Sequence, residues 1–437
     1  MATVNSKGRK PEDNHICHIW VKEPEITNDG VLTDDGLIQI ANHKYQAGSY
    51  TLLDSYLSPT LWQPLTDLLP LWLAPNVVTS IGGTYCLISF ILSSWFLSTS
   101  TTSNTMEVIP RWLYFSNGIC MFLYYTFDCM DGKQARRTGS SSPLGQLFDH
   151  GMDCICNLSH LQLVQCIVLV PPRLLVLLQC SLQFTFWQAQ WEEYYTGILP
   201  HATGKYCGVT EVNYGLALWT LSAGILGPGM YSASVVSSET VAKWEIPALN
   251  WLLKDQYTGD LAPVQVRHVA AMGWASMIIC LLTLSWMRVY LHLQNPRTFA
   301  SAMSKLVSPL LLCAVAIIAT DSYHHYVRDE SIAGYVPSCW LALGLCFCLI
   351  TIKIIVYSMA RMAYATIQVD ILPFVLVVLM IHAADDGAKL FVNPSILFAI
   401  LDLYYLGRLV YWIRAATRQL CDHLGIQLFR IQQKKGD

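Results

Sequence analysis

The chain has 437 residues, of which 53% are hydrophobic and only 13% carry an Asp, Glu, Lys or Arg side chain. Soluble globular proteins carry about a quarter of their residues as charged side chains, so this composition excludes a soluble globular class. The formal net charge of −3 offers no basic face for a nucleic-acid partner. Most of the 15 cysteines stand in apolar segments, where cysteine behaves as a small hydrophobic residue, and we expect neither disulfides nor a zinc site.

The first part of the chain is polar. Residues 1–49 predict a cytosolic N-terminal tail, loosely ordered to about residue 40, with no apolar core of a cleaved signal peptide. Residues 50–75 are rich in Leu and Trp but carry four prolines, which interrupt a helix too often for it to span a bilayer. We therefore predict an interfacial amphipathic segment there.

Apolar stretches of membrane-spanning length, about 20 residues, follow in succession. The fold class that they predict is an all-α polytopic membrane protein with about ten transmembrane helices. Basic residues in short loops mark the cytosolic side, which places the loop with Lys133, Arg136 and Arg137 there. The expected helices begin near Asn76, Ile109, Gly145, Pro172, Val209, Arg267, Lys305, Gly334, Asp370 and Pro394.

Four aspartates stand close together in residues 127–153. Asp128 and Asp131 are three residues apart, and Asp149 and Asp153 are four apart, so each pair shares one face of a helix. The short loop between them makes the two helices antiparallel neighbours. Four carboxylates at membrane depth are unfavourable unless something compensates their charge. Because Mg²⁺ and Mn²⁺ prefer carboxylate oxygens, we predict a site for two such ions, which suits phosphoryl displacement.

The residues around the aspartates fit a nucleotide diphosphate. Gly132, Ala135 and Gly145 are small where a ligand or a helix must approach the backbone. Arg136 offers donors matched to phosphate oxygens, and Lys133 adds a point charge. Each residue alone is also explained by solvated helix ends and helix packing. The joint spacing favours the diphosphate site.

This segment resembles the signature of the CDP-alcohol phosphotransferase family, Asp-x2-Asp-Gly-x2-Ala-Arg-x8-Gly-x3-Asp-x3-Asp, at every specified position. The wider segments "SPLGQLFDHGMD", "LWLAPNVVT" and "QWEEYYTGIL" are similar to the eukaryotic choline/ethanolamine phosphotransferase branch. The resemblance implies about ten helices, a homodimer and a cytosol-facing site. It also implies catalytic helices in residues 76–232, helices for lipid access or dimerisation in 233–420, and a cytosolic tail in 421–437.

The resemblance implies transfer of phosphoethanolamine or phosphocholine from the CDP-alcohol to diacylglycerol, with release of CMP. Asp128, Asp131 and Asp149 would bind the metal pair, with Asp153 completing the cluster. The metals and Arg136 would hold the diphosphate. A neutral alcohol needs a general base, and two residues compete for that role, Asp153 and His150.

Two further residues carry weaker assignments. Glu211 could relay the proton from His150, and a charge at a helix start explains it nearly as well. The resemblance places Asn76 on the nucleotide side, which is compatible with a helix N-cap.

Other polar and aromatic residues give weaker indications. Glu192 and Glu193 could favour a primary ammonium head group, and Lys353 is expected to extend its amine to the membrane surface. Four aromatic residues form a stripe along one predicted helix: Trp187, Trp191, Tyr194 and Tyr195. The stripe is typical of an interfacial belt, and a cation–π cage for the head group is the alternative.

Two other functions remain as alternatives. One is a CDP-diacylglycerol-dependent phospholipid synthase, which the "FDHGMD" context disfavours. The other is a non-catalytic ion-coupled transporter, which would need a second interrupted helix pair. The head group, ethanolamine or choline, stays open. The final residues "KKGD" resemble a dilysine retrieval signal, which predicts the endoplasmic reticulum membrane, with the Golgi as the alternative.

Overall fold

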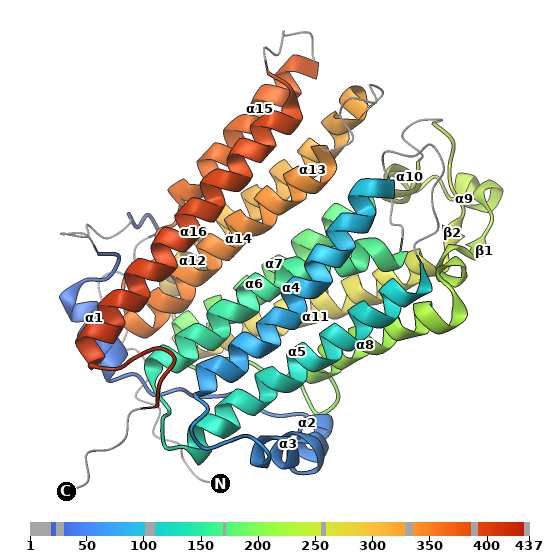
Figure 1. Ribbon diagram of the computed structural model, residues 1–437. Coiled ribbons are helices and arrows are strands. Elements are labelled where there is room, and N and C mark those ends of the chain that lie inside the picture. The colour runs from blue at the N-terminus through green and yellow to red at the C-terminus, as the bar shows by residue number, and fades with distance from the viewer. Residues whose placement is uncertain are drawn as a thin grey trace, which may run out of the picture.

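The protein is a bundle of long helices, seen here in a computed structural model (Figure 1). Every residue range and contact below refers to the part of the chain that this structure describes. The described residues are 19–22, 30–100, 110–168, 172–254, 259–327, 335–385 and 392–431.

One half of the bundle is built from helices that carry the acidic motif. It contains α4 (Pro75–Ser100), α5 (Arg111–Arg137), α6 (Pro143–Val168) and α8 (Val209–Leu226). Helix α5 packs between α4 and α8, and α4 also packs on α6. Gly82 of α4 permits the close approach to α5, because a Cβ there would lie 3.2 Å from the Tyr124 carbonyl oxygen.

The other half surrounds α14 (Tyr335–Ala360), the most apolar of the long helices. Its side chains from Cys339 to Ala360 are almost all buried, because α6, α7 (Pro172–Thr196) and α16 (Pro394–Leu424) pack against it. The remaining helices complete this half: α11 (Val266–Leu293), α12 (Pro296–Ser304), α13 (Val307–Val327), η4 (Val369–Ile371) and α15 (Leu372–Asp385).

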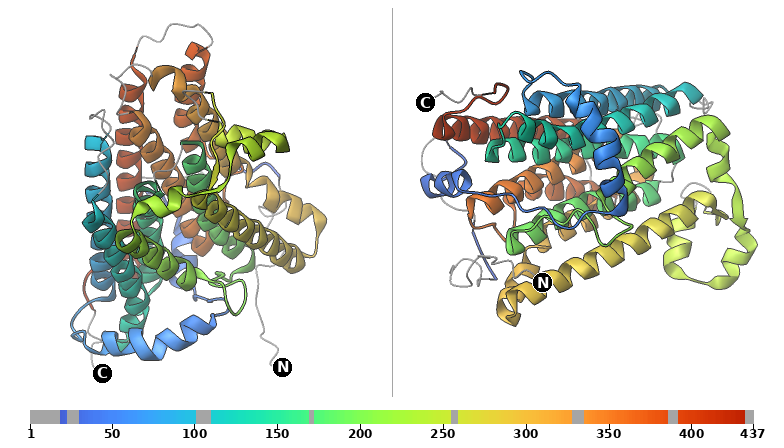
Figure 2. Two further views of the ribbon diagram at one scale, coloured as in Figure 1. Left: turned by 90° about the vertical axis from the view of Figure 1, so that its right-hand side faces the viewer. Right: turned by 90° about the horizontal axis from the view of Figure 1, so that it is seen from below.

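The two ends of the bundle differ. A bent segment, α2 (Leu52–Leu57), η1 (Ser58–Trp62) and α3 (Gln63–Asp67), crosses the end where α5 finishes. The C-terminal end of α16 lies toward that end, and a small lobe lies at the opposite end (Figures 1 and 2). The lobe comprises η2 (Pro228–Ser232), α9 (Ser238–Trp244), α10 (Pro247–Leu253) and an antiparallel pair of strands, β1 (Ser234–Val236) and β2 (Val264–Gln265).

The helices begin within a few residues of the ten predicted positions. Five segments of the described chain are long and apolar enough to cross a membrane, which supports a membrane protein. A total of about ten spans and an interfacial position for residues 50–75 stay predictions. The five segments are Pro75–Phe96, Val266–Leu293, Pro296–Asp321, Cys339–Ala360 and Pro394–Leu424.

The expected loose tail is wrong for residues 34–41. They form α1 (Asp34–Ala41), capped by the Thr33 side chain, and this helix docks on α14 and α16. Leu37 and Ile40 are buried, and the Gln419 side chain accepts hydrogen bonds from the backbone of Val31 and Leu32. A short amphipathic helix with few apolar residues is hard to distinguish from a polar tail by composition.

The aromatic stripe of α7 is not an interfacial belt. Trp187, Trp191, Tyr194 and Tyr195 are all buried in the main core, where they also satisfy their polar atoms. The Trp191 indole donates to the Ala302 carbonyl oxygen at 3.0 Å, and the Tyr194 hydroxyl donates to that of Met362 at 2.9 Å. The stripe faces other helices, so the helical spacing of these aromatic residues reflects packing in the core.

Lys353, expected to reach the membrane surface, and Glu192, expected near the head group, are both buried. Lys353 of α14 is 2% exposed and forms an ion pair with Asp370, which Arg408 of α16 also contacts at 2.8 Å. Glu192 of α7 is bound by the Arg288 guanidinium of α11, at 2.5 and 2.8 Å. The expected extension of Lys353 to the surface is therefore wrong, since a counterion holds it in the core. Glu192, likewise, serves helix packing in this structure.

Candidate metal and diphosphate site

The acidic cluster lies between two antiparallel helices, near the end of α5 and the start of α6. Asp128, Asp131 and Asp149 each offer a carboxylate oxygen, and these three atoms lie within 4.8 Å of one another. The separation of the aspartates by three residues on α5 turns both toward α6. The sequence therefore predicted the juxtaposition of these three residues correctly.

The turn between the helices holds this geometry. Gly139 ends α5 with a φ of +63°, a left-handed conformation that glycine adopts without strain. Ser142 caps α6, because its hydroxyl accepts a hydrogen bond from the Gly145 N–H at 3.1 Å. Gly145 also lies near α4, since a Cβ there would stand 3.6 Å from the Asn76 Oδ1 atom.

The fourth aspartate has a different environment. Asp153 lies one turn further along α6 than Asp149, outside the group of three converging oxygens. Its Oδ1 atom accepts a hydrogen bond from the Tyr124 hydroxyl of α5 at 2.6 Å. Tyr124 is buried and was not identified from the sequence, because a tyrosine in an apolar helix gives no signal of its own.

Helix α4 supplies a third wall. The Thr79 hydroxyl donates a hydrogen bond to the Asp131 carboxylate, and the same hydroxyl contacts the Pro75 carbonyl oxygen at 3.3 Å. Asn76, one turn earlier, donates its amide N–H to the carbonyl oxygen of Leu428 at 2.7 Å. Sequence reasoning identified Asn76 but missed Thr79, which lies 52 residues from its partner.

His150 lies between the acidic cluster and the loop that carries Tyr45. Its ring is buried, with Nε2 4.0 Å from an Asp149 carboxylate oxygen. Among the described residues, its Nδ1 atom has no hydrogen-bond partner. The Tyr45 ring stands 5.8 Å away, edge to face. His150 is thus adjacent to the cluster without being part of it.

Two loops bring aromatic residues beside His150. Leu199 exchanges backbone hydrogen bonds with residues on either side of Ala47, which joins residues 46–48 to residues 197–201. The Tyr45 hydroxyl hydrogen-bonds His201, and the Tyr50 ring stacks on His201 with centroids 6.0 Å apart. Burial lowers the pKa of His201, although Asp54 acts in the opposite direction. Neither Tyr45 nor His201 was expected here.

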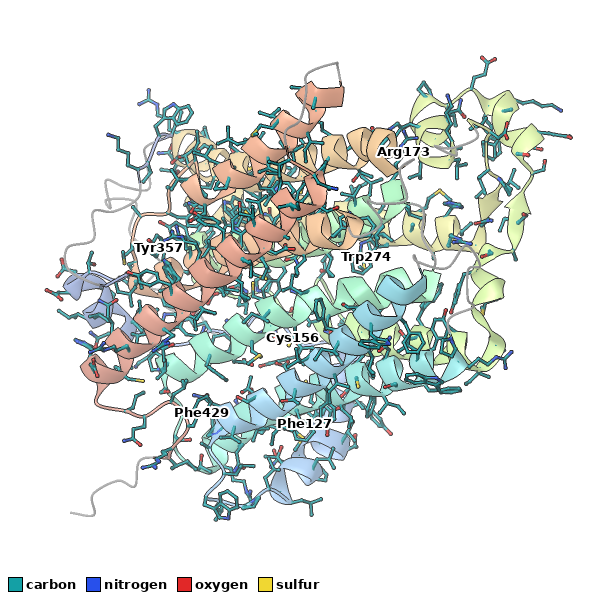
Figure 3. The ribbon with its side chains drawn as sticks, turned by 45° about the horizontal axis from the view of Figure 1, so that its top comes forward. Phe127, Cys156, Arg173, Trp274, Tyr357 and Phe429 are labelled. Carbon is teal, nitrogen blue, oxygen red and sulfur yellow. The ribbon has the colours of Figure 1, made fainter. Side chains whose placement is uncertain are left out.

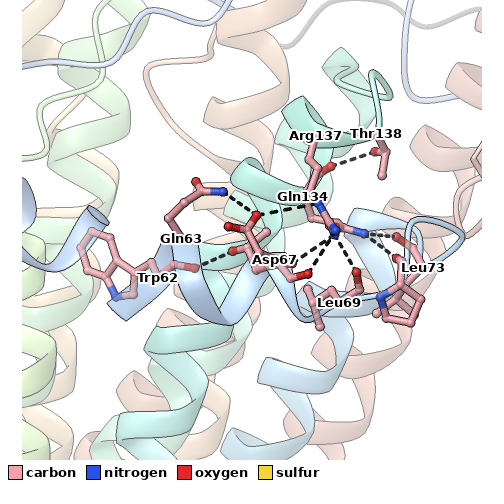
Figure 4. Close-up of polar contacts among 10 residues, drawn as sticks. Trp62, Gln63, Asp67, Leu69, Leu73, Gln134, Arg137 and Thr138 are labelled. Atoms are coloured by element: carbon pink, nitrogen blue, oxygen red, sulfur yellow. Dashed lines mark hydrogen bonds and ion pairs between the residues drawn. The ribbon is translucent and has the colours of Figure 1, made fainter. Parts of the chain in front are cut away.

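The basic end of α5 is occupied by the bent segment that precedes α4. Arg137 donates to the carbonyl oxygens of Thr66, Asp67 and Leu69 (Figure 4). Gln134 donates to those of Pro70 and Leu73, and Lys133 donates to the Ser58 hydroxyl at 2.7 Å. These bonds hold the segment across the C-terminal end of α5.

Arg136 differs from these neighbours. Its side chain is exposed, and its guanidinium lies over Gly132, where a Cβ would be 3.6 Å from the Nη1 atom. Ala135, the other small residue of the motif, accepts a hydrogen bond from the Ser140 N–H at 3.0 Å through its carbonyl oxygen. Arg136 is therefore placed at the open side of the cluster.

Glu211 lies in the first turn of α8, beside the bent segment. Its Oε2 atom is buried without a hydrogen-bond partner among the described residues. The preceding residue, Thr210, hydrogen-bonds both Asp54 of α2 and the Tyr125 hydroxyl of α5. This network positions the start of α8 against α5, and it leaves the Glu211 carboxylate available.

The donor set suits divalent cations. Asp128 and Asp149 each have a buried Oδ1 atom without a hydrogen-bond partner among the described residues. A buried, uncompensated carboxylate is strongly unfavourable, and several close together repel one another. Hard cations such as Mg²⁺ and Mn²⁺ bind carboxylate oxygens, so the cluster fits such ions.

Comparison with known proteins agrees with this geometry. Residues 72–226 match the family model of the CDP-alcohol phosphatidyltransferases. The matched range contains α4, α5, α6, α7 and α8. It therefore contains the whole acidic cluster and the three helices that form its walls.

Relatives extend the similarity to most of the chain. Ethanolaminephosphotransferase 1 of Homo sapiens is 26% identical over 402 residues, which cover 90% of this chain and 93% of the relative. Choline/ethanolaminephosphotransferase 2 of Arabidopsis thaliana is 25% identical over 424 residues, covering 93% and 100%. Cholinephosphotransferase 1 of Saccharomyces cerevisiae is 30% identical over 275 residues, covering 62% and 65%.

Proposed function

We propose that the chain, whose residues 72–226 match the family model of the CDP-alcohol phosphatidyltransferases, transfers phosphoethanolamine, phosphocholine or both from the CDP-alcohol to diacylglycerol. CMP is released, and phosphatidylethanolamine or phosphatidylcholine is formed. The observation that carries the proposal is the convergence of the Asp128, Asp131 and Asp149 oxygens within 4.8 Å, inside the matched range. The names of relatives that cover nine-tenths of the chain support the substrate class.

In this proposal Asp128, Asp131 and Asp149 hold the metal ions, one or two Mg²⁺ or Mn²⁺, and Asp153 completes the charge of the site. Such ions, when bound, neutralise charge on the phosphoryl oxygens and on the leaving CMP. Arg136 binds the diphosphate from the exposed side, since its guanidinium already lies over Gly132. Lys133 adds positive charge at the same end of α5, and Gly145 leaves room beside Asn76.

The proton acceptor in this proposal is His150. The diacylglycerol oxygen forms a bond to the phosphorus that bears the head group, and its proton passes to His150. The bond from that phosphorus to the bridging oxygen breaks, and CMP leaves with that oxygen. A buried ring nitrogen without a partner supports His150, whereas Asp153, the alternative, accepts a hydrogen bond from Tyr124. Glu211 takes the proton onward from His150.

The proposal extends to the setting of the enzyme. We assign about ten membrane spans, with residues 50–75 at the bilayer interface and the acidic cluster facing the cytosol. Residues 76–232 carry the chemistry, and residues 233–420 provide lipid access and a homodimer contact. The endoplasmic reticulum membrane is the proposed location, with the Golgi as the alternative. The two lysines that suggest it, Lys434 and Lys435, lie outside the described residues.

Reconstituted protein tests the reaction. The protein is given CDP-ethanolamine, diacylglycerol and Mg²⁺ or Mn²⁺, and CMP release is measured beside an Asp149→Asn variant. CMP release that depends on metal and on diacylglycerol supports the proposal. CMP release no higher than that of the Asp149→Asn variant would contradict it. Competition between CDP-choline and CDP-ethanolamine in the same assay reports the head-group preference.

The two alternatives predict different results in that assay. A CDP-diacylglycerol-dependent synthase would release CMP from CDP-diacylglycerol with a free alcohol such as inositol, serine or glycerol phosphate. A transporter would release no CMP from either donor.

A substitution of His150 tests the assignment of the general base. His150→Asn should lower the maximal rate by about 10²–10⁴ while the affinity for CMP stays unchanged. A smaller loss than that of Asp153→Asn would favour Asp153.

A further inference from the structure

The last described segment of the chain, which follows α16, reaches back to the proposed nucleotide site. The Leu428 carbonyl oxygen accepts a hydrogen bond from the Asn76 amide nitrogen at 2.7 Å, across a separation of 352 residues. Asn76 is the second residue of α4, one turn before Thr79. The chain end therefore contacts a residue that faces the motif.

This hydrogen bond decides how the Asn76 side chain is oriented. An asparagine amide offers both donors and an acceptor, and rotation by 180° exchanges them. A carbonyl oxygen can only accept, so the nitrogen must face Leu428 and Oδ1 must point away. Oδ1 stands 3.6 Å from the position of a Cβ on Gly145, a small residue of the motif. The side chain thus presents an acceptor toward the site.

The segment is held by contacts of its own. Gly425, with a φ of +64°, ends α16, and the Ile426 N–H then donates to the Cys421 carbonyl oxygen at 3.2 Å. The Phe429 ring packs edge to face on Phe148 with centroids 5.6 Å apart. Phe148 directly precedes Asp149 on α6, and Figures 2 and 3 show the segment folded back beside the bundle. These contacts fix the position of the Leu428 carbonyl oxygen.

We propose that the C-terminal segment Gly425–Ile431 is a positioning element of the nucleotide site. It holds the Asn76 amide so that Oδ1 accepts a hydrogen bond from an N–H or O–H donor of the CDP part of the substrate. This inference rests on the proposed function. Asn76 lies beside Gly145 and is separate from the group of converging aspartate oxygens, so the segment acts on binding of the nucleotide.

Two shortened chains test the segment. A chain that ends at Leu424 loses the Leu428 carbonyl oxygen, whereas a chain that ends at Ile431 keeps it and is the matched control. Loss of one orienting hydrogen bond should raise the KM for CDP-ethanolamine about 3- to 10-fold in the shorter chain. The KM for diacylglycerol should stay unchanged, and so should every constant of the control chain. The dissociation constant of CMP, measured by calorimetry without diacylglycerol, should rise by the same factor as the KM.

A double-mutant cycle separates positioning from general stability. Asn76→Ala is made in the full chain and in the chain that ends at Leu424. If the segment acts through Asn76, removing it from the Asn76→Ala protein should change the CMP dissociation constant by less than about 1.5-fold. Effects that multiply would overturn the proposal, since the segment would then act through other residues.

A milder variant decides the matter if the chain ending at Leu424 does not fold. Phe429→Ala removes the ring that packs on Phe148 and keeps the Leu428 backbone. It should weaken CMP binding about 2- to 3-fold in the full chain and leave it unchanged in the Asn76→Ala background. An equal loss in both backgrounds contradicts the proposal. A full chain that binds CMP but releases none from CDP-alcohols would instead count against the proposed reaction.

Discussion

The Thr79 hydroxyl of α4 donates a hydrogen bond to the Asp131 carboxylate of α5. This contact joins the helix before the motif to the most buried aspartate of the cluster, which is 6% exposed. The hydroxyl leaves the other lone pairs of Asp131 available and restrains the rotation of its carboxylate. Residues that orient a metal ligand in this way contribute to metal affinity.

The first prediction concerns Thr79→Val, which removes the hydroxyl and nearly keeps the volume. The Mg²⁺ concentration that gives half-maximal CMP release should rise about tenfold, within the range seen when an outer hydrogen bond to a ligand is removed. The matched control is Thr84→Val, because that hydroxyl donates to the Ser80 carbonyl oxygen at an exposed position of the same helix. An equal rise in both variants would contradict a role for Thr79 in metal binding.

The second prediction separates Asp153 from the other aspartates. Since Asp153 lies outside the group of three converging oxygens and accepts a hydrogen bond from Tyr124, Asp153→Asn should still bind at least one Mn²⁺. Asp149→Asn should lose Mn²⁺ binding, because it removes one of the three ligands. Electron paramagnetic resonance counts the bound ions. Equal loss of Mn²⁺ in both variants would show that Asp153 contributes to metal binding as much as Asp149 does.

Much of the site could be predicted from sequence because its main residues are close in the chain. The spacing of Asp128, Asp131 and Asp149 on two adjacent helices determines that they meet. Thr79, Tyr124, Tyr45 and His201 could not be predicted, since each depends on how distant segments pack. Threonine and tyrosine are also common in apolar helices for packing alone.

For the fold, the positions of the helices could be predicted from the sequence, but their packing could not. Apolar stretches located the long helices to within a few residues, whereas the partners of each helix were not readable. The aromatic stripe of α7 illustrates the limit. In a lipid-facing belt and in a buried core, Trp and Tyr recur on one helix face with the same period, so only the packing of α14 distinguishes the two. Lys353 was misplaced for the same reason, because its counterion Asp370 comes from another element.

The third prediction concerns this buried ion pair. Asp370→Ala removes the carboxylate that contacts both Lys353 and Arg408, and it leaves the buried Lys353 and the partly exposed Arg408 without that counterion. The loss should be about 3–5 kcal/mol of stability, seen as a lower thermal midpoint of the purified protein. Asp422→Ala is the control, because its pair with Arg418 spans 3.9 Å between side chains that are 75% and 86% exposed. Its effect should stay below about 1 kcal/mol, and equal shifts in both variants would refute the distinction.

The fourth prediction concerns pH and His201, which lies in the loop between α7 and α8. Burial lowers the pKa of His201 below its ordinary value of 6.5, so the folded protein binds this proton less readily than the unfolded chain. Stability from the neutral ring is therefore fully present above about pH 6.5 and declines as the pH falls toward the folded-state pKa. Tyr45 contacts the ring at Nε2 through its hydroxyl, and the neutral tautomer with an unprotonated Nε2 can accept that hydrogen bond, which a doubly protonated ring cannot do.

His201→Gln tests this relation, because glutamine can accept a hydrogen bond and does not titrate. Between pH 7 and pH 5.5 the thermal midpoint of the variant should fall less than that of the unaltered protein. His423→Gln, at an exposed position near the end of α16, should leave the pH dependence unchanged. If the His201→Gln protein loses stability as steeply as the unaltered one, the acid sensitivity comes from other groups and the His201–Tyr45 contact does not contribute to it.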